Sequence, residues 1–431
     1  MVCPRPLVIA CLMALALIGP RAVSPVSCAP RETSGSQASE ASSLLASLRA
    51  EKPREIPYEL RPYKIRAWVA VDPSTRLDQR GRENLIRLWI TLTERFIGQP
   101  WDVEVAEGEG PLLAAHLDNL QPDEVAPLAQ GFDKAWVIQV RPIQEGYGLE
   151  LSGREYDSAT AQVGLICTRR SKTVEDAARA MLMLSLDMFA PTAQIGKKSG
   201  GGVTIKVQGA MLPSSSPVGQ VVKEGYVFRA SRVIYNPDGS VRKIFPIART
   251  YLRVQALEGP VAYCGIISKL RDPLTSMIVG RYKVVAVGIR PTAMPTKLRF
   301  LSRVAYGPPE EKRFVERPAA GYTLTVRPAP DGPQRVVGIT DRDGRIELPP
   351  YFDDGLVILR LLAANIEPLD EIPLMPGELD EERTYVIDPK TEAVTLEAEL
   401  NSLRDQIVDQ VAVRARLDAL IRPRVEAENW D

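Results

Sequence analysis

The spacing of apolar residues changes near residue 200, and this change constrains the fold more than any other feature of the sequence. Between residues 81 and 96 apolar side chains recur at i, i+3, i+4 and i+7, as on one face of an α-helix. Beyond residue 203 they recur at every second position, as in half-buried strands. With 431 residues, two to four domains are expected. The sequence therefore predicts an α+β multidomain protein in which a mixed α/β domain precedes all-β domains.

Residues 63–195 are predicted to form the α/β domain. Thr173 is expected to cap its last helix, with Asp176 three residues later. Residues 148–156 and 162–168 are expected to pair as a hairpin. The predicted strands are 64–71, 101–105, 134–140, 148–156 and 162–168, and the predicted helices are 81–96, 111–120 and 173–189.

The glycine-rich segment Gly196–Gly202 (GKKSGGG) is interpreted as a flexible joint. It does not match a phosphate-binding loop, because Pro191 stands where that motif requires its first glycine. Residues 203–306 then predict an all-β barrel or sandwich, and the pattern leaves both open. Its expected strands are 203–207, 226–235, 241–245, 251–257, 262–267 and 282–289, with 297–304 as a further candidate.

After a hinge at Pro308–Lys312, residues 317–389 are predicted to form a β-sandwich, with Gly338–Pro350 as strand, Asp-Gly turn and strand. The segment Tyr322–Val326, the turn Asp341–Gly344 and the return Ile346–Pro350 resemble the carboxypeptidase-regulatory or transthyretin-like sandwich. This resemblance implies a spacer or adhesion element without an active site.

The Asp341–Gly344 turn also invites comparison with a calcium loop. If Gly344 were the sixth residue of an EF-hand loop, Ile339 and Pro350 would stand at positions one and twelve. Neither side chain carries a carboxylate, so the sequence favours a turn in which Asp and Gly satisfy the backbone dihedrals.

Residues 390–431 predict a long C-terminal helix, since neither Gly nor Pro occurs from Glu392 to Ile421. Leu396, Leu400, Leu403 and Ile407 alternate spacings of four and three, as in a coiled-coil seam, and Gln410 and Arg414 interrupt it. Two interpretations stay open: the helix packs on its own domains, which is favoured, or it meets a partner helix.

The N-terminal residues 1–28 have the pattern of a signal peptide. Arg5 precedes the apolar run Leu7–Gly19, which is about 20 Å long as a helix and too short for a bilayer core of about 30 Å. The alternative is an uncleaved anchor or a hydrophobic N-terminal helix. Residues 29–62 are expected to be a disordered linker with a short helix at 43–49. We expect an exported protein, periplasmic or extracellular; lipid anchoring at Cys28 is disfavoured because Pro25 replaces the usual Leu.

Cysteine use and charge narrow the chemistry further. Of five cysteines, Cys167 and Cys264 remain if residues 1–28 are removed, and they either form one bridge or are two buried thiols, which is favoured. Lys+Arg and Asp+Glu are both 54, so no net charge favours nucleic acid or an anionic membrane.

The sequence offers few residues for catalysis. His116 is the single histidine, which rules out a His-rich zinc site and leaves a nucleophilic triad dependent on this one residue. Glu150 and Glu155 are the candidates for a carboxylate pair, although 54 acidic residues make this choice arbitrary. No catalytic, cofactor-binding or metal-ligating residue is predicted, and no cofactor.

We therefore expect a non-enzymatic exported protein with a structural, assembly or binding role at the cell envelope or outside the cell. The alternatives are a protein- or glycan-binding accessory module and a hydrolase that uses acidic residues. The expected partner is another envelope or extracellular protein, or a glycan, with no nucleic acid and no transmembrane segment in the mature chain.

Overall fold

The computed structural model describes residues 56–426, except 76, 109, 144–146, 200, 238–240, 275–281, 307–312, 351–354, 364–366, 379–380 and 388–391. The predicted signal peptide, the helix at 43–49 and the hinge at 308–312 lie outside these residues. None of the described helices is long and apolar enough to cross a membrane.

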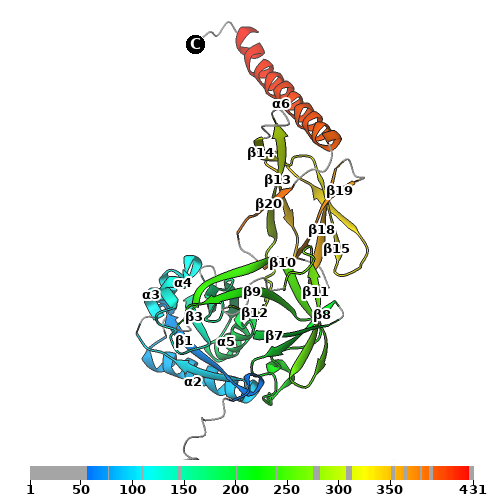
Figure 1. The fold of residues 1–431 in the computed structure, drawn as a ribbon. Coiled ribbons are helices and arrows are strands. Elements are labelled where there is room, and N and C mark those ends of the chain that lie inside the picture. Colours follow the sequence, from blue (N-terminus) through cyan, green and yellow to red (C-terminus); the bar gives the residue numbers. More distant parts are fainter. Residues whose placement is uncertain are drawn as a thin grey trace, which may run out of the picture. The chain divides into compact units, whose positions relative to one another are not determined.

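The N-terminal part is a six-stranded sheet with helices, shown in blue to green in Figure 1. β1 runs parallel to β2 and β3, and β4 runs antiparallel to β3, in the order β2-β1-β3-β4-β5 with β6 also paired to β4. The strands are β1 Tyr63–Val71, β2 Trp101–Val105, β3 Lys134–Pro142, β4 Leu149–Asp157, β5 Gln162–Val163 and β6 Cys167–Ser171. The helices are η1 Tyr58–Leu60, η2 Pro73–Thr75, α2 Gln79–Phe96, α3 Gly110–Ala115, η3 Leu117–Asn119, α4 Pro122–Val125 and α5 Val174–Met188.

The two long helices of this part begin where their sequences provide caps. The Asp78 carboxylate accepts a hydrogen bond from Gly81 N at 2.7 Å, and the Thr173 hydroxyl accepts one from Asp176 N at 3.2 Å. α2 buries Leu85 and Trp89 against the sheet, as its apolar spacing predicts, whereas Leu88 and Phe96 of the same pattern are exposed. Capping and periodicity therefore account for both helices.

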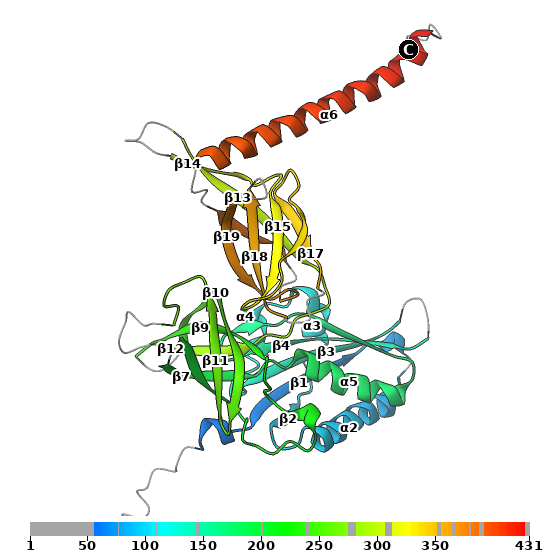
Figure 2. The same ribbon diagram turned by 90° about the vertical axis from the view of Figure 1, so that its right-hand side faces the viewer.

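Six strands form a closed barrel in the order β10-β11-β8-β7-β12-β9 (Figure 2), which decides between the barrel and sandwich interpretations. The strands are β7 Thr192–Ser199, β8 Gly202–Val207, β9 Val227–Tyr235, β10 Val241–Glu258, β11 Val261–Ser268 and β12 Tyr282–Gly288, with a short helix η4 at Pro217–Gly219. The prediction of a flexible joint at Gly196–Gly202 is wrong, because Ser199 pairs with Gly202 in a β7–β8 hairpin. The segments 241–245 and 251–257 are one strand, β10, whose register shifts between Pro246 and Tyr251.

Eight further strands form two four-stranded sheets with a shared apolar core, as expected of a sandwich. One sheet has the order β14-β13-β17 with β20 on β13, and the other has the order β16-β15-β18-β19. The strands are β13 Thr296–Tyr306, β14 Arg313–Pro318, β15 Thr323–Pro328, β16 Arg335–Ile339, β17 Arg345–Leu348, β18 Val357–Ala363, β19 Glu367–Leu374 and β20 Arg383–Ile387. The sequence predicts residues 297–304 as a strand of the preceding domain. The structure corrects this assignment, because the segment belongs to β13, which pairs with β14, β17 and β20.

The Asp341–Gly344 turn does not close a hairpin within one sheet. β16 pairs with β15, whereas β17 pairs with β13 in the opposite sheet, so the turn is a corner between the two layers. The Asp341 carboxylate accepts hydrogen bonds from the backbone N–H of Asp343 and Arg345, and Gly344 has φ +73°. A Cβ at Gly344 would lie 2.2 Å from Phe300 O, so the corner requires glycine.

The predicted C-terminal helix is present as α6, Glu392–Glu426, and it continues for one turn past Pro423. The expected packing of this helix against its own domains is not found among its described apolar side chains, which are exposed. Arg342 of the corner turn forms an ion pair with Asp409 of α6.

Residues 56–62, predicted as part of the linker, are ordered against the barrel. Gly209 N donates to Tyr58 O, and Met211 N donates to Glu59 O at 3.0 Å. One apolar core runs from the α/β sheet into the barrel, with Trp136, Phe189 and Phe228 among its members. The α/β part and the barrel are therefore joined through a shared core.

Candidate functional site

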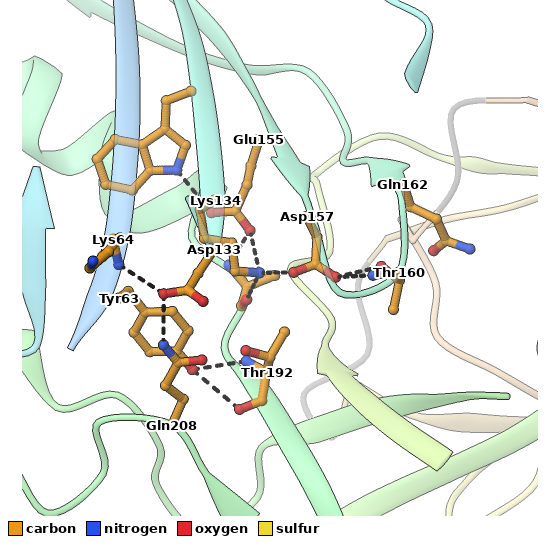
Figure 3. Close-up of polar contacts among 12 residues, drawn as sticks. Tyr63, Lys64, Asp133, Lys134, Glu155, Asp157, Thr160, Gln162, Thr192 and Gln208 are labelled. Carbon is orange, nitrogen blue, oxygen red and sulfur yellow. Dashed lines mark hydrogen bonds and ion pairs between the residues drawn. The ribbon is translucent and has the colours of Figure 1, made fainter. Parts of the chain in front are cut away.

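A cluster of three buried charges lies where the α/β sheet meets the barrel. Lys134 opens β3, and Glu155 and Asp157 close β4 (Figure 3). The antiparallel register sets Lys134 opposite Asp157 and Trp136 opposite Glu155. Lys134 Nζ lies 2.7 Å from Asp157 Oδ1 and 3.1 Å from Glu155 Oε1. Because the three side chains are at most 7% exposed, their charges interact in a medium that screens poorly.

Almost all polar atoms of this cluster form hydrogen bonds or ion pairs within the protein. Glu155 Oε1 accepts from Lys134 Nζ and from Ala190 N at 3.0 Å, and its Oε2 accepts from Trp136 Nε1 at 2.9 Å. Lys134 Nζ also donates to Ala190 O at 2.5 Å. Asp157 Oδ2 accepts from the backbone and hydroxyl of Thr160, while its Oδ1 meets Lys134 as an ion pair without hydrogen-bond geometry. Such saturation is what a buried charge requires for stability.

The environment shifts the protonation equilibria of the cluster. Burial alone would lower the pKa of Lys134, but Asp157 and Glu155 outweigh burial and hold that pKa above its usual value. Burial raises the pKa of Glu155, against the opposing effects of Lys134 and the Trp136 and Ala190 N–H groups. Lys134 therefore stays protonated, which does not suit a catalytic base.

A second polar group ties the same sheet to the barrel. Gln208 Nε2 donates to Asp133 Oδ2 at 3.0 Å and to Pro62 O at 3.1 Å. Tyr63 OH donates to Thr192 O at 3.2 Å and accepts from Thr192 N at 2.9 Å (Figure 3). Since Thr192 begins the first barrel strand, these contacts fix its position on the sheet.

A small pocket of about 90 Å³ adjoins the charge cluster. Glu155 and Asp157 line it from the sheet, Arg229 and Arg290 from the barrel side, and Glu378 from the loop that precedes β20. Glu378 accepts from Tyr251 OH at 2.6 Å and Arg383 Nη1 at 3.0 Å, and burial raises its pKa. Ligand pockets usually measure about 300–1,000 Å³, so this space suits water or a very small ion.

A larger hollow of about 490 Å³ lies beside β11 and β19. Its buried carboxylate, Asp370, already forms ion pairs with Arg249 at 3.2 Å and with Lys269. The described lining therefore offers no uncompensated charge for a ligand.

The structure does not bring together Glu150 and Glu155, the two acidic residues that the sequence offers as a carboxylate pair. Glu150 and Glu155 both lie on β4, five residues apart, so they point to opposite faces and lie about 17 Å apart along the strand. Glu150 pairs with Arg170 at 3.0 Å on a partly exposed surface. These two residues therefore do not form an acid–base pair.

The other candidate residues are also dispersed. His116 is exposed at the N-cap of η3. Cys167 and Cys264 are free thiols, and burial is the main cause that raises their pKa values to about 11 and about 12. Among the residues that the structure describes, no group of three or more His, Cys, Asp or Glu side chains is arranged to hold a metal ion.

Sequence reasoning missed Lys134 and Asp157, although a signal for them exists. Lys134 lies on the same face of β3 as the buried Trp136 and Ile138, because alternate residues of a strand share a face. A charged residue therefore occupies a core position. Asp157 lies on the same face of β4 as Glu155, two residues away. Charges at core positions of two adjacent strands predict a buried ion pair once the pairing is known.

Comparisons with known proteins do not assign the chain to a family. No family model and no curated protein matches it. Among solved structures, TolB from Acinetobacter baumannii aligns at 13% identity over 75% of this chain and 97% of its own, with a TM-score of 0.20. The BSP domain of a biofilm-associated protein aligns at 12% identity over 56% of this chain and 46% of its own, with a TM-score of 0.11. These scores do not establish a shared fold, so the functional argument depends on the chain's own residues.

Proposed function

We propose that the protein is a non-enzymatic exported scaffold that assembles with another protein chain through its C-terminal helix, α6. The proposal rests on one observation, the exposed apolar surface of that helix. The α/β part, the barrel and the sandwich then serve as the body that carries the helix.

Among the side chains of α6 that the structure describes, nine large apolar ones are between 45% and 62% exposed. They are Leu403, Ile407, Val408, Val411, Val413, Leu417, Leu420, Ile421 and Val425. Single exposed apolar residues need no explanation on a protein surface, but nine on one helix indicate an interaction site. A helix in a protein also gains most of its stability from packing rather than from intrinsic propensity. A partner chain on α6 supplies that packing.

The buried polar contacts support a structural body rather than a reaction centre. The Lys134–Glu155–Asp157 cluster is engaged internally, and the pocket beside it holds about 90 Å³. Two carboxylates that must activate water and protonate a leaving group need room between them for substrate. The hydrolase alternative gains no support from this site.

Export and the sandwich assignment complete the proposal. The apolar run Leu7–Gly19 after Arg5 supports a signal peptide and a periplasmic or extracellular location. The two four-stranded sheets built from residues 296–387 support placing this module with carboxypeptidase-regulatory or transthyretin-like sandwiches as a spacer. The partner is then an envelope or extracellular protein.

The experiment is chemical cross-linking in intact cells that export the chain, comparing Ile407→Glu with Ala412→Glu. Both residues are exposed on α6, but Ile407 belongs to the apolar seam and Ala412 does not. We expect cross-linked adducts of higher mass from the wild type and Ala412→Glu, and their loss from Ile407→Glu. Equal adducts from both variants, or none from the wild type, would refute assembly through α6.

A further inference from the structure

The seam of α6 resumes after its interruption, and this continuation defines a register for pairing. In a seven-residue repeat with Leu400 and Ile407 at position a, Leu403 lies at position d. The next d and a positions are Gln410 and Arg414, and the following ones are Leu417 and Ile421. One polar block of two layers therefore separates two apolar blocks on the same seam of one continuous helix (Figure 2).

We propose that α6 pairs with α6 of a second copy of this chain as an antiparallel two-stranded coiled coil centred near residue 412. This inference rests on the proposed function and names the partner. In this register Leu403 meets Ile421 of the second copy, and Ile407 meets Leu417 of the second copy. The remaining central layer sets Gln410 against Arg414 of the second copy, where an amide oxygen accepts from a guanidinium.

The polar block decides the direction of pairing. A parallel pair in register sets position 414 against itself, which brings two guanidinium groups together in the seam. Shifting the antiparallel pair by one heptad in either direction sets Ile407 against Gln410 or Arg424 of the second copy. Of these registers, only the one centred near 412 sets both Leu403 and Ile407 against apolar residues and Gln410 against Arg414. Its outermost layer sets Leu400 against Arg424 of the second copy.

The residues that flank the seam fit the same register. In an antiparallel pair, e positions face e positions and g positions face g positions across the seam. Val411, at e, and Val413, at g, each lie next to their own counterpart at the centre, where they cover the polar block. Positions 404 and 418, both e, carry Arg and Asp and face each other with opposite charge. The pairing therefore brings both valines, which lie outside the a and d positions, into the interface.

The axis of such a pair is a two-fold axis, so each copy contributes the same surface. Arg342 pairs with Asp409, which occupies position c, outside the a, d, e and g surface. The ion pair and the proposed contact therefore use different faces of the helix.

Cysteine cross-linking of the full-length chain tests the register. Leu403→Cys and Ile421→Cys are prepared separately, with tags of different length, and are oxidised alone and after mixing and exchange. Positions 403 of the two copies lie about 27 Å apart in the antiparallel pair, and a disulfide requires Cα atoms within about 7 Å. We expect a disulfide-linked dimer only in the mixture, containing one copy of each variant. The wild type, which keeps Cys167 and Cys264, gives the background.

Two results would overturn the proposal. Dimers formed by each variant alone, with none specific to the mixture, indicate parallel pairing. A full-length chain that is monomeric by light scattering at tens of micromolar and gives no cross-link rejects a second copy as partner. In that case, adducts with a different protein that disappear in Ile407→Glu keep the proposed function, while their absence rejects both.

Discussion

Replacement of Lys134 by Met tests whether the buried charge cluster holds the α/β sheet to the barrel. The substitution removes the cation at 2.7 Å from Asp157 and 3.1 Å from Glu155 and leaves two buried carboxylates without a counter-charge. Ala190 O loses its donor in the same step. Removing one partner of a buried ion pair costs about 3–5 kcal/mol, so we expect a loss of that size in the free energy of unfolding.

Urea denaturation followed by tryptophan fluorescence is the assay, because Trp136 contacts the cluster directly. Arg303→Met is the matched control: Arg303 pairs with Glu316 at 3.3 Å with both side chains about 40% exposed or more. Exposed pairs contribute about 0–1 kcal/mol. The double variant Lys134→Met/Asp157→Asn should recover part of the loss, since only one buried charge then lacks a partner.

The loss should also depend on pH in a defined direction. A buried carboxyl without its cation has a folded-state pKa above its unfolded value, so the folded state binds more protons than the unfolded state between these two values. Stability then rises as pH falls, and the defect of Lys134→Met should be smaller at about pH 5 than at about pH 8. A defect below about 1 kcal/mol at both pH values, equal to that of the exposed control, would refute a structural role for the cluster.

Three further predictions concern single positions. Gly344→Ala should destabilise the protein by more than the roughly 1–3 kcal/mol of a strained backbone, because the added Cβ would lie 2.2 Å from a carbonyl oxygen. Gly201→Ala is the control, since Gly201 has φ +86° and open space around it, so this variant measures the backbone cost alone. Equal melting temperatures for the two variants would contradict the clash. Cys167 and Cys264, with pKa values of about 11 and about 12, should not react with a thiol reagent at neutral pH until the chain unfolds. Peptide mapping measures this, and labelling of either thiol in the native chain would contradict the prediction. Burial raises the pKa of Tyr58 to about 12, so Tyr58→Phe should remove a late step from the alkaline ultraviolet titration, and an unchanged curve would count against its burial.

Helices and regular strands were predictable because their signals are local. Residues 81–96 and 173–189 combine a capping side chain with apolar residues on one face, and the structure has α2 and α5 within two residues of these bounds. The strands of the barrel after residue 203 follow from period-two patterns in the same way.

Non-local pairing explains the errors. Gly196–Gly202 has the composition of a linker, but β7 pairs with β12, which lies about ninety residues later, and no local feature announces that contact. Residues 241–245 and 251–257 are predicted as two strands, whereas β10 continues past Pro246 with an irregular register. The corner at Asp341–Gly344 was recognised as a turn, yet the sheets it joins depend on partners elsewhere in the chain.

The candidate site was predictable only in part for a related reason. Glu155 was considered from the sequence, but beside Glu150, which lies on the opposite face of β4. Its true partner, Lys134, becomes visible only when the β3–β4 register is known, because a shift by one residue moves a side chain to the other face. The sequence predicts which residues of one strand share a face, but it does not predict how the two strands pair.

The most direct test of assembly through α6 is a photo-activated cross-linker placed at single positions of the full-length chain in cells that export it. Position 407 lies on the seam, and position 412 lies on the opposite face of the same helix, so the two differ only in orientation. The account predicts a discrete adduct from position 407 and none from position 412. Equal labelling from both positions, or none from position 407, would contradict the claim that α6 is the assembly surface.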